Sequence, residues 1–452
     1  MPFSEVTFAS SNCKKMKKTK LYVAITLVLT QTISWAQDTI VISKKEIINK
    51  AADKNLQIKI ADQSFKAAQA DYRQSNALFL PSITASHTGI STTNPLMAFG
   101  SKLNQEILTQ ADFNPALLNN PARTQNFATK IEILQPLINI DGYYGRQAAK
   151  AKMEAFQFQT ERTKEYLELE INKAYMQLQL AYKAVTVLNK ANTTALSNLQ
   201  VVNNYFKQGM LQKTDVLTVE VRVNEIKNQL QYAKSNVQNA SDYLAFLINE
   251  DLSNSVFKPI EALENSINTI ATNPLLSGDR KDLLAMDQSV KAYEKMAQSS
   301  QMNFLPRLNA FGSYELYDKN ILGMGASGYL VGAQLSWNVF DGYKSIGKME
   351  KAKAEHQKSS IENQQYKAQS QIELNKTNRQ LKDAENKVNL TQLALQQSEE
   401  AYRIRNNRFQ QGLEKTSDLL QAATQMSQKE LELLQAIFEY NITKEYLQFL
   451  TK

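Results

Sequence analysis

The feature of this sequence that most constrains its fold is an internal duplication. A block that ends in glycine, Tyr205 to Gly209, returns 203 residues later as Arg408 to Gly412. The same offset brings the block 243–247 (Tyr-Leu-Ala-Phe-Leu) onto 446–450 (Tyr-Leu-Gln-Phe-Leu). Two separate stretches that match at one offset indicate that both lie in the same repeated structural unit.

Two further blocks recur in the same chain order. Phe-Leu-Pro ends at Pro81 and again at Pro306, and Asp-Gly-Tyr begins at Asp141 and again at Asp341. The halves are therefore predicted to share one plan, in which a helix leads to two strands, a long helix, a tip and a returning helix. At 452 residues with only 14 glycines and 9 prolines, the chain favours few and long elements.

Each tip glycine lies alone in a long helical run. No proline occurs between Pro136 and Pro259, and none follows Pro306. Gly209 is the only glycine between residues 145 and 278, and Gly412 is the only one after residue 347. Because glycine readily adopts the left-handed conformation that ends a helix, each one predicts a tight hairpin between two long helices.

The returning helices carry an apolar seam. After the first tip, apolar residues follow a 3-4 spacing for nearly five heptads, which predicts coiled-coil packing against a partner helix. These positions are Val216, Val219, Val223, Ile226, Leu230, Ala233, Val237, Ala240, Leu244 and Leu247. Eight of the ten equivalent positions after the second tip are apolar too.

Helix lengths indicate how these elements stack. The long helices, about 141–206 and 341–409, each span ~100 Å at 1.5 Å per residue. A returning helix of ~55 Å (213–248 or 415–451) placed end to end on a leading helix of ~40–55 Å (43–78 or 279–304) matches that length. We therefore expect a shaft in which two short helices pair with each long one.

Four segments change to a period of two, at about 82–90, 126–136, 307–317 and 329–339. Strands with one apolar and one polar face are typical of a transmembrane barrel. A soluble, half-buried sheet is the alternative, because it shows the same alternation. Four strands cannot close a barrel in lipid, so insertion requires several protomers, and three would give twelve strands. The connection at about 91–125 is predicted to be a long external loop with Asn-Pro turns.

The N-terminus reads as an export signal over residues 1–36, with an anchor helix as the alternative. Five lysines precede an apolar stretch, and small residues end at Ala36. Without this segment, which holds five bases and one acid, the net charge of +8 falls to +4. That mixed charge does not favour nucleic acid. The single cysteine, Cys13, lies upstream of the apolar stretch, so neither a lipid anchor nor disulfides are expected.

Together these motifs resemble the TolC-type outer-membrane efflux family over residues 40–452. The resemblance implies an α+β membrane protein in which duplicated coiled-coil hairpins form a periplasmic tunnel and three protomers share a 12-stranded β-barrel. It also implies a homotrimer in the outer membrane that docks with a periplasmic adaptor and an inner-membrane pump of the RND, ABC or MFS class. The predicted domains are repeat one (37–248), a mid-shaft linker (249–277) and repeat two (278–452).

The resemblance also carries site residues onto the tips. The resemblance implies that four tip residues contact the adaptor: Phe206, Gly209, Phe409 and Gly412. It also implies that Asp215 and Asp418 lie at the closed end of the tunnel. Some relatives tie the entrance with an arginine two residues after the second tip glycine, where this chain has Glu414. Six aspartates near one axis would favour cations, and helix capping is the alternative role for both residues.

Nothing in the sequence favours catalysis. Its two histidines, His87 and His356, have no partner at metal-ligand spacing, and no glycine-rich phosphate loop precedes a helix. We therefore expect no cofactor, no metal and no enzyme activity. The favoured function is the passive exit duct of a tripartite efflux or type I secretion system. The alternatives are an exported adhesive coiled-coil protein and the periplasmic adaptor, which should have one hairpin and a lipoyl-like domain.

Overall fold

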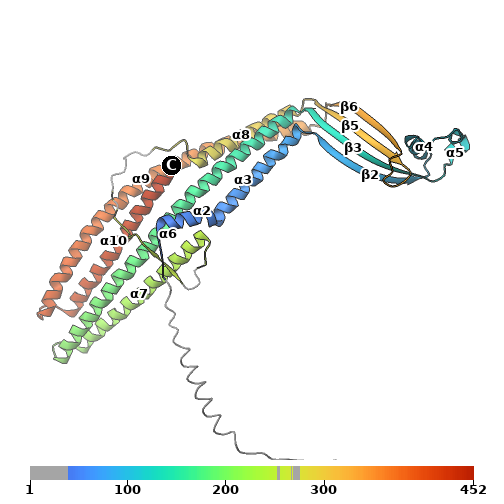
Figure 1. Cartoon of the computed structure of the whole chain (residues 1–452). Coiled ribbons are helices and arrows are strands. Elements are labelled where there is room, and N and C mark those ends of the chain that lie inside the picture. Colours follow the sequence, from blue (N-terminus) through green and yellow to red (C-terminus); the bar gives the residue numbers. More distant parts are fainter. Residues whose placement is uncertain (1–38, 252–254, 266, 268–274) are drawn as a thin grey trace, which may run out of the picture.

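The chain forms an elongated shaft with the tips at one end and a β-sheet at the other (Figure 1). The structure, a computed structural model, describes residues 39–251, 255–265, 267 and 275–452. The predicted signal segment 1–36, including Cys13, lies outside the described residues. No helix within the described ranges is both long and apolar enough to cross a membrane.

The helices of the first repeat follow the predicted order, with one break. Asn55 separates the two leading helices because its side chain caps the second, accepting hydrogen bonds from the backbone N–H of Gln57 and Ile58. The single leading helix expected over 43–78 is therefore two helices and a 3₁₀ turn. The elements are α2 (Lys44–Lys54), α3 (Leu56–Gln74), η1 (Ser75–Leu78), α6 (Ile140–Lys207) and α7 (Lys213–Ile248).

The second repeat contains α8 (Lys281–Met302), α9 (Lys344–Gln410) and α10 (Thr416–Thr451). Its long helix begins three residues later than expected. In the first repeat, the Asn139 side chain caps α6 by accepting from Gly142 N, and Asp141 lies inside the helix. Val339 stands at the equivalent position and cannot cap, so Gly342 and Tyr343 adopt left-handed conformations before α9 begins.

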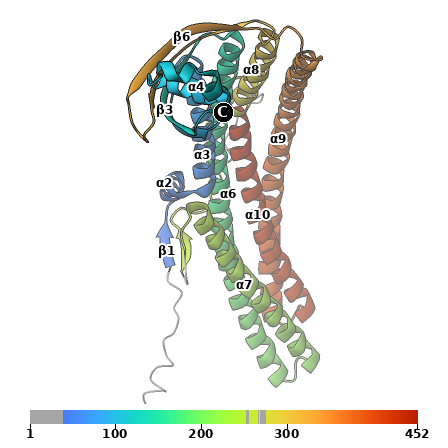
Figure 2. The same cartoon turned by 90° about the vertical axis from the view of Figure 1, so that its right-hand side faces the viewer.

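Short helices stack along the long ones, as the lengths indicated. Near the sheet the packing order is α3–α6–α8–α9, and near the tips it is α7–α6–α10–α9 (Figure 2). Nine of the ten predicted seam positions on α7 are buried, with Leu230 the half-buried exception. On α10 the two seam positions that are not buried are the polar ones, Lys429 and Thr443. The coiled-coil hairpins of the predicted fold are therefore present.

Four antiparallel strands form the sheet, in the order β2 (Ser82–Thr92), β3 (Thr124–Ile138), β5 (Arg307–Asp318) and β6 (Ala326–Ser336). Their register sorts the side chains into two faces. Ile131, Tyr314 and Tyr329 pair across one face. Lys130 pairs with Glu315 on the other, where their charged atoms are 3.5 Å apart. One face is thus mainly apolar across β3, β5 and β6, and the other carries the charged pair. On β2 the apolar face is interrupted by His87, whose Nδ1 is 2.9 Å from Thr129 Oγ1.

The long connection between β2 and β3 is folded, unlike the loop that the sequence predicted. It contains α4 (Pro95–Asn104), η2 (Gln110–Phe113) and α5 (Pro115–Asn119). Two of its three Asn-Pro pairs begin helices: Asn94 and Asn114 accept hydrogen bonds from backbone N–H groups of the first turn, and proline occupies the first helical position. The same dipeptide that suggests a turn here starts a helix.

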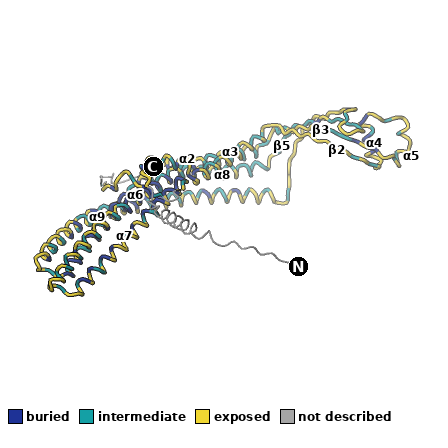
Figure 3. Tube along the Cα trace, turned by 60° about the horizontal axis from the view of Figure 1, so that its bottom comes forward, coloured by how far each residue is buried: buried dark blue, intermediate teal, exposed yellow. Residues whose placement is uncertain are grey.

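A small parallel sheet at mid-shaft joins the start of the first repeat to the linker. Strand β1 (Thr39–Ile42) pairs with β4 (Val256–Pro259), which lies inside the segment expected to be a linker. The largest buried cluster lies beneath it, and buried residues concentrate between mid-shaft and the tips (Figure 3). Tyr175 is 1% exposed in this cluster and donates hydrogen bonds to Ile42 O and Glu261.

Candidate functional site: the two hairpin tips

Both tips have the same backbone geometry. Gly209 and Gly412 have φ angles of +76° and +72°. Met210 N donates to Tyr205 O and Leu413 N donates to Arg408 O, each at 2.9 Å, so each tip closes with the six-residue bond of a Schellman motif. A side chain at either glycine would occupy the left-handed region that L residues disfavour. The repeated glycines therefore set the shape of both tips.

The first tip is closed by apolar side chains, here called the apolar clasp. Val202 on α6 is fully buried, and Tyr205 and Leu211 pack against the same cluster. That cluster also includes Val216 and Val219 from the returning helix α7. Burial of these side chains holds the two arms of the hairpin together without charges.

The second tip is closed by ion pairs, here called the ionic clasp. Glu414 Oε1 lies 2.9 Å from Arg405 Nη1, and Glu414 Oε2 lies 2.8 Å from Arg408 Nε. The Glu414 side chain is only 12% exposed, whereas the arginines are 42% and 56% exposed. Arg408 also donates to Leu413 O at 3.3 Å. Glu414 therefore binds within its own hairpin, to the two arginines that precede the tip glycine.

The 203-residue offset relates the two clasps position by position. It places Val202 on Arg405, Tyr205 on Arg408 and Leu211 on Glu414. Three apolar residues in one tip are thus replaced by three charged residues in the other. The sequence contained this signal in the aligned repeats, but Arg405 and Arg408 were not singled out from it.

The two tips lie side by side and contact each other. Tyr205 Oη donates to Gln410 O at 3.0 Å, and the Tyr205 and Phe409 ring centroids are 5.8 Å apart. Phe409 is 3% exposed and packs with Val202 and Leu419 in the shared cluster. One buried ring from the second tip therefore supports both tips.

Of the two predicted docking phenylalanines, one is exposed and the other is buried. Phe206 is 38% exposed, with Lys213 Nζ 5.9 Å from its ring centroid. Its counterpart Phe409 is buried and presents no surface. The most exposed apolar side chains at the tips are Met210 and Leu413, at 70% and 63%. Each directly follows a tip glycine, and that shared position was the signal that sequence reasoning missed.

The two predicted gate aspartates differ in their contacts. Asp215 Oδ2 accepts from Gln212 N at 3.0 Å and forms a capping box at the start of α7. Asp418 lies in the first turn of α10, and its carboxylate is 3.6 Å from Arg405. The capping alternative thus describes Asp215, while Asp418 is next to the ionic clasp.

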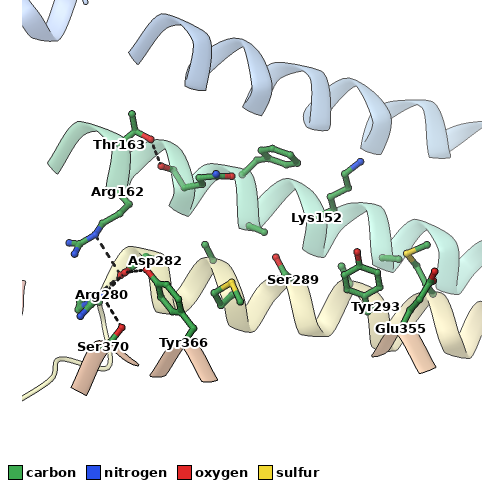
Figure 4. A pocket seen from close by; sticks show the side chains of 18 of the residues that line it. Lys152, Arg162, Thr163, Arg280, Asp282, Ser289, Tyr293, Glu355, Tyr366 and Ser370 are labelled. Atoms are coloured by element: carbon green, nitrogen blue, oxygen red, sulfur yellow. Dashed lines mark hydrogen bonds and ion pairs between the residues drawn. The ribbon is translucent and has the colours of Figure 1, made fainter. Parts of the chain in front are cut away.

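A buried ion cluster lies far from the tips, at the start of α8 (Figure 4). Arg280 and Tyr366 donate to Asp282 Oδ2 at 2.5 and 2.6 Å, and Arg162 Nε is 3.6 Å from Asp282 Oδ1. Burial alone would raise the pKa of Asp282, but hydrogen bonds from Arg280 and Tyr366 and the Arg162 charge outweigh it and lower that pKa to about 2.

The same arginines cap the end of α10. Arg162 donates to Phe449 O at 3.2 Å and lies over the Phe449 ring, with Cζ 3.5 Å from its centroid. Arg280 Nη1 donates to Leu450 O at 3.4 Å. Cations that satisfy the last carbonyls of a helix also complement its dipole. The cluster therefore joins α10 to α8 end to end and makes the stacked shaft continuous.

A cavity of ≈ 1630 Å³ extends from this cluster along α6, α8 and α9. Figure 4 shows Lys152, Ser289, Tyr293 and Glu355 along its walls. Small side chains on its walls, among them Ala148 and Ala155 on α6 and Ala292 on α8, keep the space open. The space follows from small residues on the facing helices rather than from a cluster of reactive groups.

Comparison with known proteins connects this architecture to a family. The family model for the outer membrane efflux protein matches residues 47–250 and 275–451, which together cover both repeats. Among curated protein sequences, none matches the chain. The family consists of passive outer-membrane channels, in agreement with the prediction that the chain is not an enzyme.

Several solved structures have the same fold. A membrane protein from Pseudomonas aeruginosa superposes with a TM-score of 0.79 at 16% identity, covering 93% of this chain and 95% of its own. The outer membrane protein VceC from Vibrio cholerae superposes with a TM-score of 0.75 at 15% identity, covering 90% of this chain and 96% of its own. The CmeC outer membrane channel from Campylobacter jejuni also superposes with a TM-score of 0.75 at 15% identity, covering 100% of this chain and 93% of its own.

These comparisons confirm the predicted fold class for one protomer and its location in the outer membrane with the shaft in the periplasm. They match the repeats, the long hairpins and the four-stranded sheet together rather than any single motif. The chain belongs to the outer membrane efflux protein family.

Proposed function

We propose that three copies of this chain form the exit duct of a tripartite efflux or type I secretion system. The observation that carries this proposal is that the sheet and the helical shaft of each protomer both end in edges to which a neighbouring protomer could bind. In the sheet, β2 and β6 are unpaired edges. In the shaft, α9 lies at one end of each helix row and α3 and α7 lie at the other.

The edge helices carry stripes of exposed apolar and aromatic side chains, although the Tyr243 hydroxyl donates to Glu170 at 3.2 Å. On α7, Val221, Tyr232 and Tyr243 recur every 11 residues and are 57%, 71% and 45% exposed. On α9, Ile361 and Ile372 are likewise 11 residues apart and are 63% and 65% exposed. Because 11 residues make three helical turns, each stripe is a nearly straight line of side chains. The α9 stripe is level with α8, where the α3 edge of a neighbour would cover it. Nearer the tips, level with α7, α9 exposes Leu390 and Leu393 at 68% and 51%, so edges at opposite ends of the row fit a head-to-tail contact between protomers.

A head-to-tail contact closes into a ring when its rotation allows. In such a ring, β6 of one protomer pairs with β2 of the next, and α9 packs on the next α3 and α7. Three protomers then share twelve strands, and no backbone edge remains exposed to lipid. The mainly apolar face of the sheet would lie toward lipid and the face with Lys130 and Glu315 toward the lumen.

The tips would then surround the periplasmic mouth and receive the adaptor that links the duct to an inner-membrane pump. We assign direct contact to Phe206, Met210 and Leu413, because these side chains are exposed. Gly209 and Gly412 hold their backbone in position, and Phe409 supports them from the core. This assignment changes the predicted role of Phe409 from contact to support.

Asp215, Asp418 and Glu414 would lie around that mouth as candidates for its gate. Carboxylates that converge on a pore axis favour cations. The charge of Asp418 is opposed by Arg405 and that of Glu414 by two arginines, whereas Asp215 accepts only hydrogen bonds. We expect Asp215→Asn to lower cation selectivity in single-channel recordings more than Asp418→Asn does. Equal loss in both variants would contradict this gate.

The assembly is tested by gel electrophoresis of the outer-membrane fraction. The duct predicts a trimer that persists in unheated detergent and dissociates on heating. The double variant Met210→Asp, Leu413→Asp should keep the trimer but lose export of efflux substrates by cells. Ile260→Asp is the matched control, because Ile260 is as exposed as Leu413, at 63%, but lies at mid-shaft. A monomer, or normal export by the double variant, would contradict the proposal.

A further inference from the structure

The folded connection between β2 and β3, residues 93–123 and here called the exit cap, is held in a fixed shape. Lys102 Nζ is 2.7 Å from Asp112 Oδ1, and Asp112 Oδ2 accepts from Thr109 N at 2.8 Å. The Phe99 and Phe113 ring centroids are 5.7 Å apart in an edge-to-face contact. These contacts tie α4 to η2, so the cap is a folded element at the far end of the sheet.

The exit cap lies on the polar face of the sheet. Gln105 Nε2 donates to Asn126 Oδ1 and to Gln125 O, each at 2.8 Å. Asn126 alternates with Phe127 along β3 and therefore shares a face with Lys130. Helix α4 packs against β3 and β6, and it lies inside the arc that β6 traces (Figure 2). In the proposed duct this is the lumen side of the wall.

The opposite side of α4 is apolar and uncovered. Ala98, Ser101 and Gln105 face the sheet and are 0%, 5% and 6% exposed. At 100° per residue, Leu96 and Leu103 project directly away from that buried side, and they are 81% and 56% exposed. Four more apolar side chains of the cap are exposed: Met97, Ile107, Phe113 and Leu117. Exposed apolar side chains gathered on one folded element indicate an interaction site.

Dimensions show what can cover this surface. Twelve strands ~4.8 Å apart and tilted by ~40° enclose a backbone ring ~24 Å across. Helices with side chains are ~10 Å in diameter, and three touching cylinders of that width occupy a circle ~22 Å across. Because inward side chains of the strands narrow that ring further, three α4 helices, one on each lumen wall, could not avoid contact in the bore. Their position on the lumen side keeps them away from lipid.

We propose that the three exit caps pack against one another through Leu96 and Leu103 and form an apolar constriction at the outer mouth of the duct. This inference rests on the proposed trimer. The partner of each cap is the same segment of the other two chains. Passage of a substrate requires the caps to separate, so the duct has a second narrow point that does not depend on the tips. Apolar constrictions in channels also limit ion flow by dewetting.

Cysteine cross-linking tests the contact directly. In a Cys13→Ser background the chain has no other cysteine, so Leu96→Cys places one thiol per protomer. Oxidation should give disulfide-linked dimers with one chain of each trimer left over, because bonded residues need Cα atoms within ~7 Å. Tyr329→Cys is the matched control, since Tyr329 is 82% exposed on the apolar face near the same end. It should give no dimers.

Conductance supplies the second measurement. The double variant Leu96→Asp, Leu103→Asp places like charges at the constriction, and single-channel conductance should rise about twofold or more. An intact heat-modifiable trimer in which Leu96→Cys does not cross-link, or in which the double aspartate variant conducts like the parent, would overturn the exit cap proposal. The trimeric duct would stand in that case. Absence of the trimer would instead overturn the proposed function, and with it this inference.

Discussion

In the first tip, Val202, Tyr205 and Leu211 close the hairpin by burial, whereas in the second tip Glu414 closes it between two arginines. The backbone is the same in both, because glycine and the Schellman bond fix it. The side chains that support it changed together at three equivalent positions. Duplication has thus preserved the shape of the tip while the residues at these three positions changed from apolar to charged. Both tips still share the apolar cluster around Phe409.

The two clasps differ in expected strength. Full burial of one valine or leucine side chain contributes roughly 1.5–3 kcal/mol. A partly exposed ion pair contributes about 0–1 kcal/mol and weakens with salt. The first tip is therefore expected to be the stiffer of the two and the second the more easily opened. The two tips would then be unequal partners in docking and gating.

The largest effect is expected at the ring that both tips share. Phe409→Ala should lower the local free energy of opening of both tips by about 3–5 kcal/mol, because it leaves a cavity in their common cluster. Amide hydrogen exchange around Gly209 and Gly412 measures this. Phe206→Ala, at the equivalent exposed position, should cost less than about 1 kcal/mol. Similar losses in the two variants would show that burial does not distinguish the tips.

Exchanging the closing residues between the tips tests which clasp contributes more to stability. Leu211→Glu places a carboxylate against apolar side chains without an arginine partner and should cost about 1–3 kcal/mol at the first tip. Glu414→Leu removes ion pairs whose arginines can still reach water, so it should cost about 1 kcal/mol or less. Hydrogen exchange at each tip gives both values. A larger loss from Glu414→Leu would reverse the ranking of the clasps.

The buried ion cluster around Asp282 differs from the exposed ion pairs of the second tip. The pKa of Asp282 is lowered from 3.8 to about 2, so its contribution to stability is complete above pH ~4 and is lost as the pH falls towards 2. Thermal unfolding followed between pH 5 and pH 2 should show an acid-sensitive step. Asp282→Asn should remove that step. An unchanged pH profile in the variant would assign the step to other carboxylates.

The smallest expected effect is that of salt. Raising NaCl from about 0.05 to 1 M should weaken hydrogen-exchange protection at the second tip by a few-fold, because exposed ion pairs are screened. Protection at the first tip should not fall. The triple variant Arg405→Val, Arg408→Tyr, Glu414→Leu, which gives the second tip the residues of the first, should remove the difference. Equal salt sensitivity in both tips would argue against an ionic clasp.

Much of the fold could be predicted from repeated local patterns. The tip glycines, the 3-4 seam of α7 and the alternation in the strands each depend on residues close in sequence, and all three occur in the structure. The late start of α9 was also encoded locally, in the change from Asn139 to Val339. It was missed because Asp-Gly-Tyr was assigned the same role in both repeats.

Other features depend on contacts between distant residues. Strand β4 is four residues long and pairs with β1, more than two hundred positions earlier, so neither has a local signature. Likewise, Phe409 and Phe206 occupy the same motif position, and only the packing of one hairpin on the other buries Phe409. The location of the exit cap on the polar face depends on Gln105 reaching Asn126.

In the proposed assembly three chains close one continuous conduit, with the tips at one mouth and the exit caps at the other. Single-channel recording of the purified, heat-modifiable trimer in planar bilayers tests it most directly. A closed trimeric conduit should give discrete and long-lived conductance steps that favour cations. Intact trimers that insert into the bilayer yet show no conductance steps would contradict it, and would favour the exported adhesive protein without a pore.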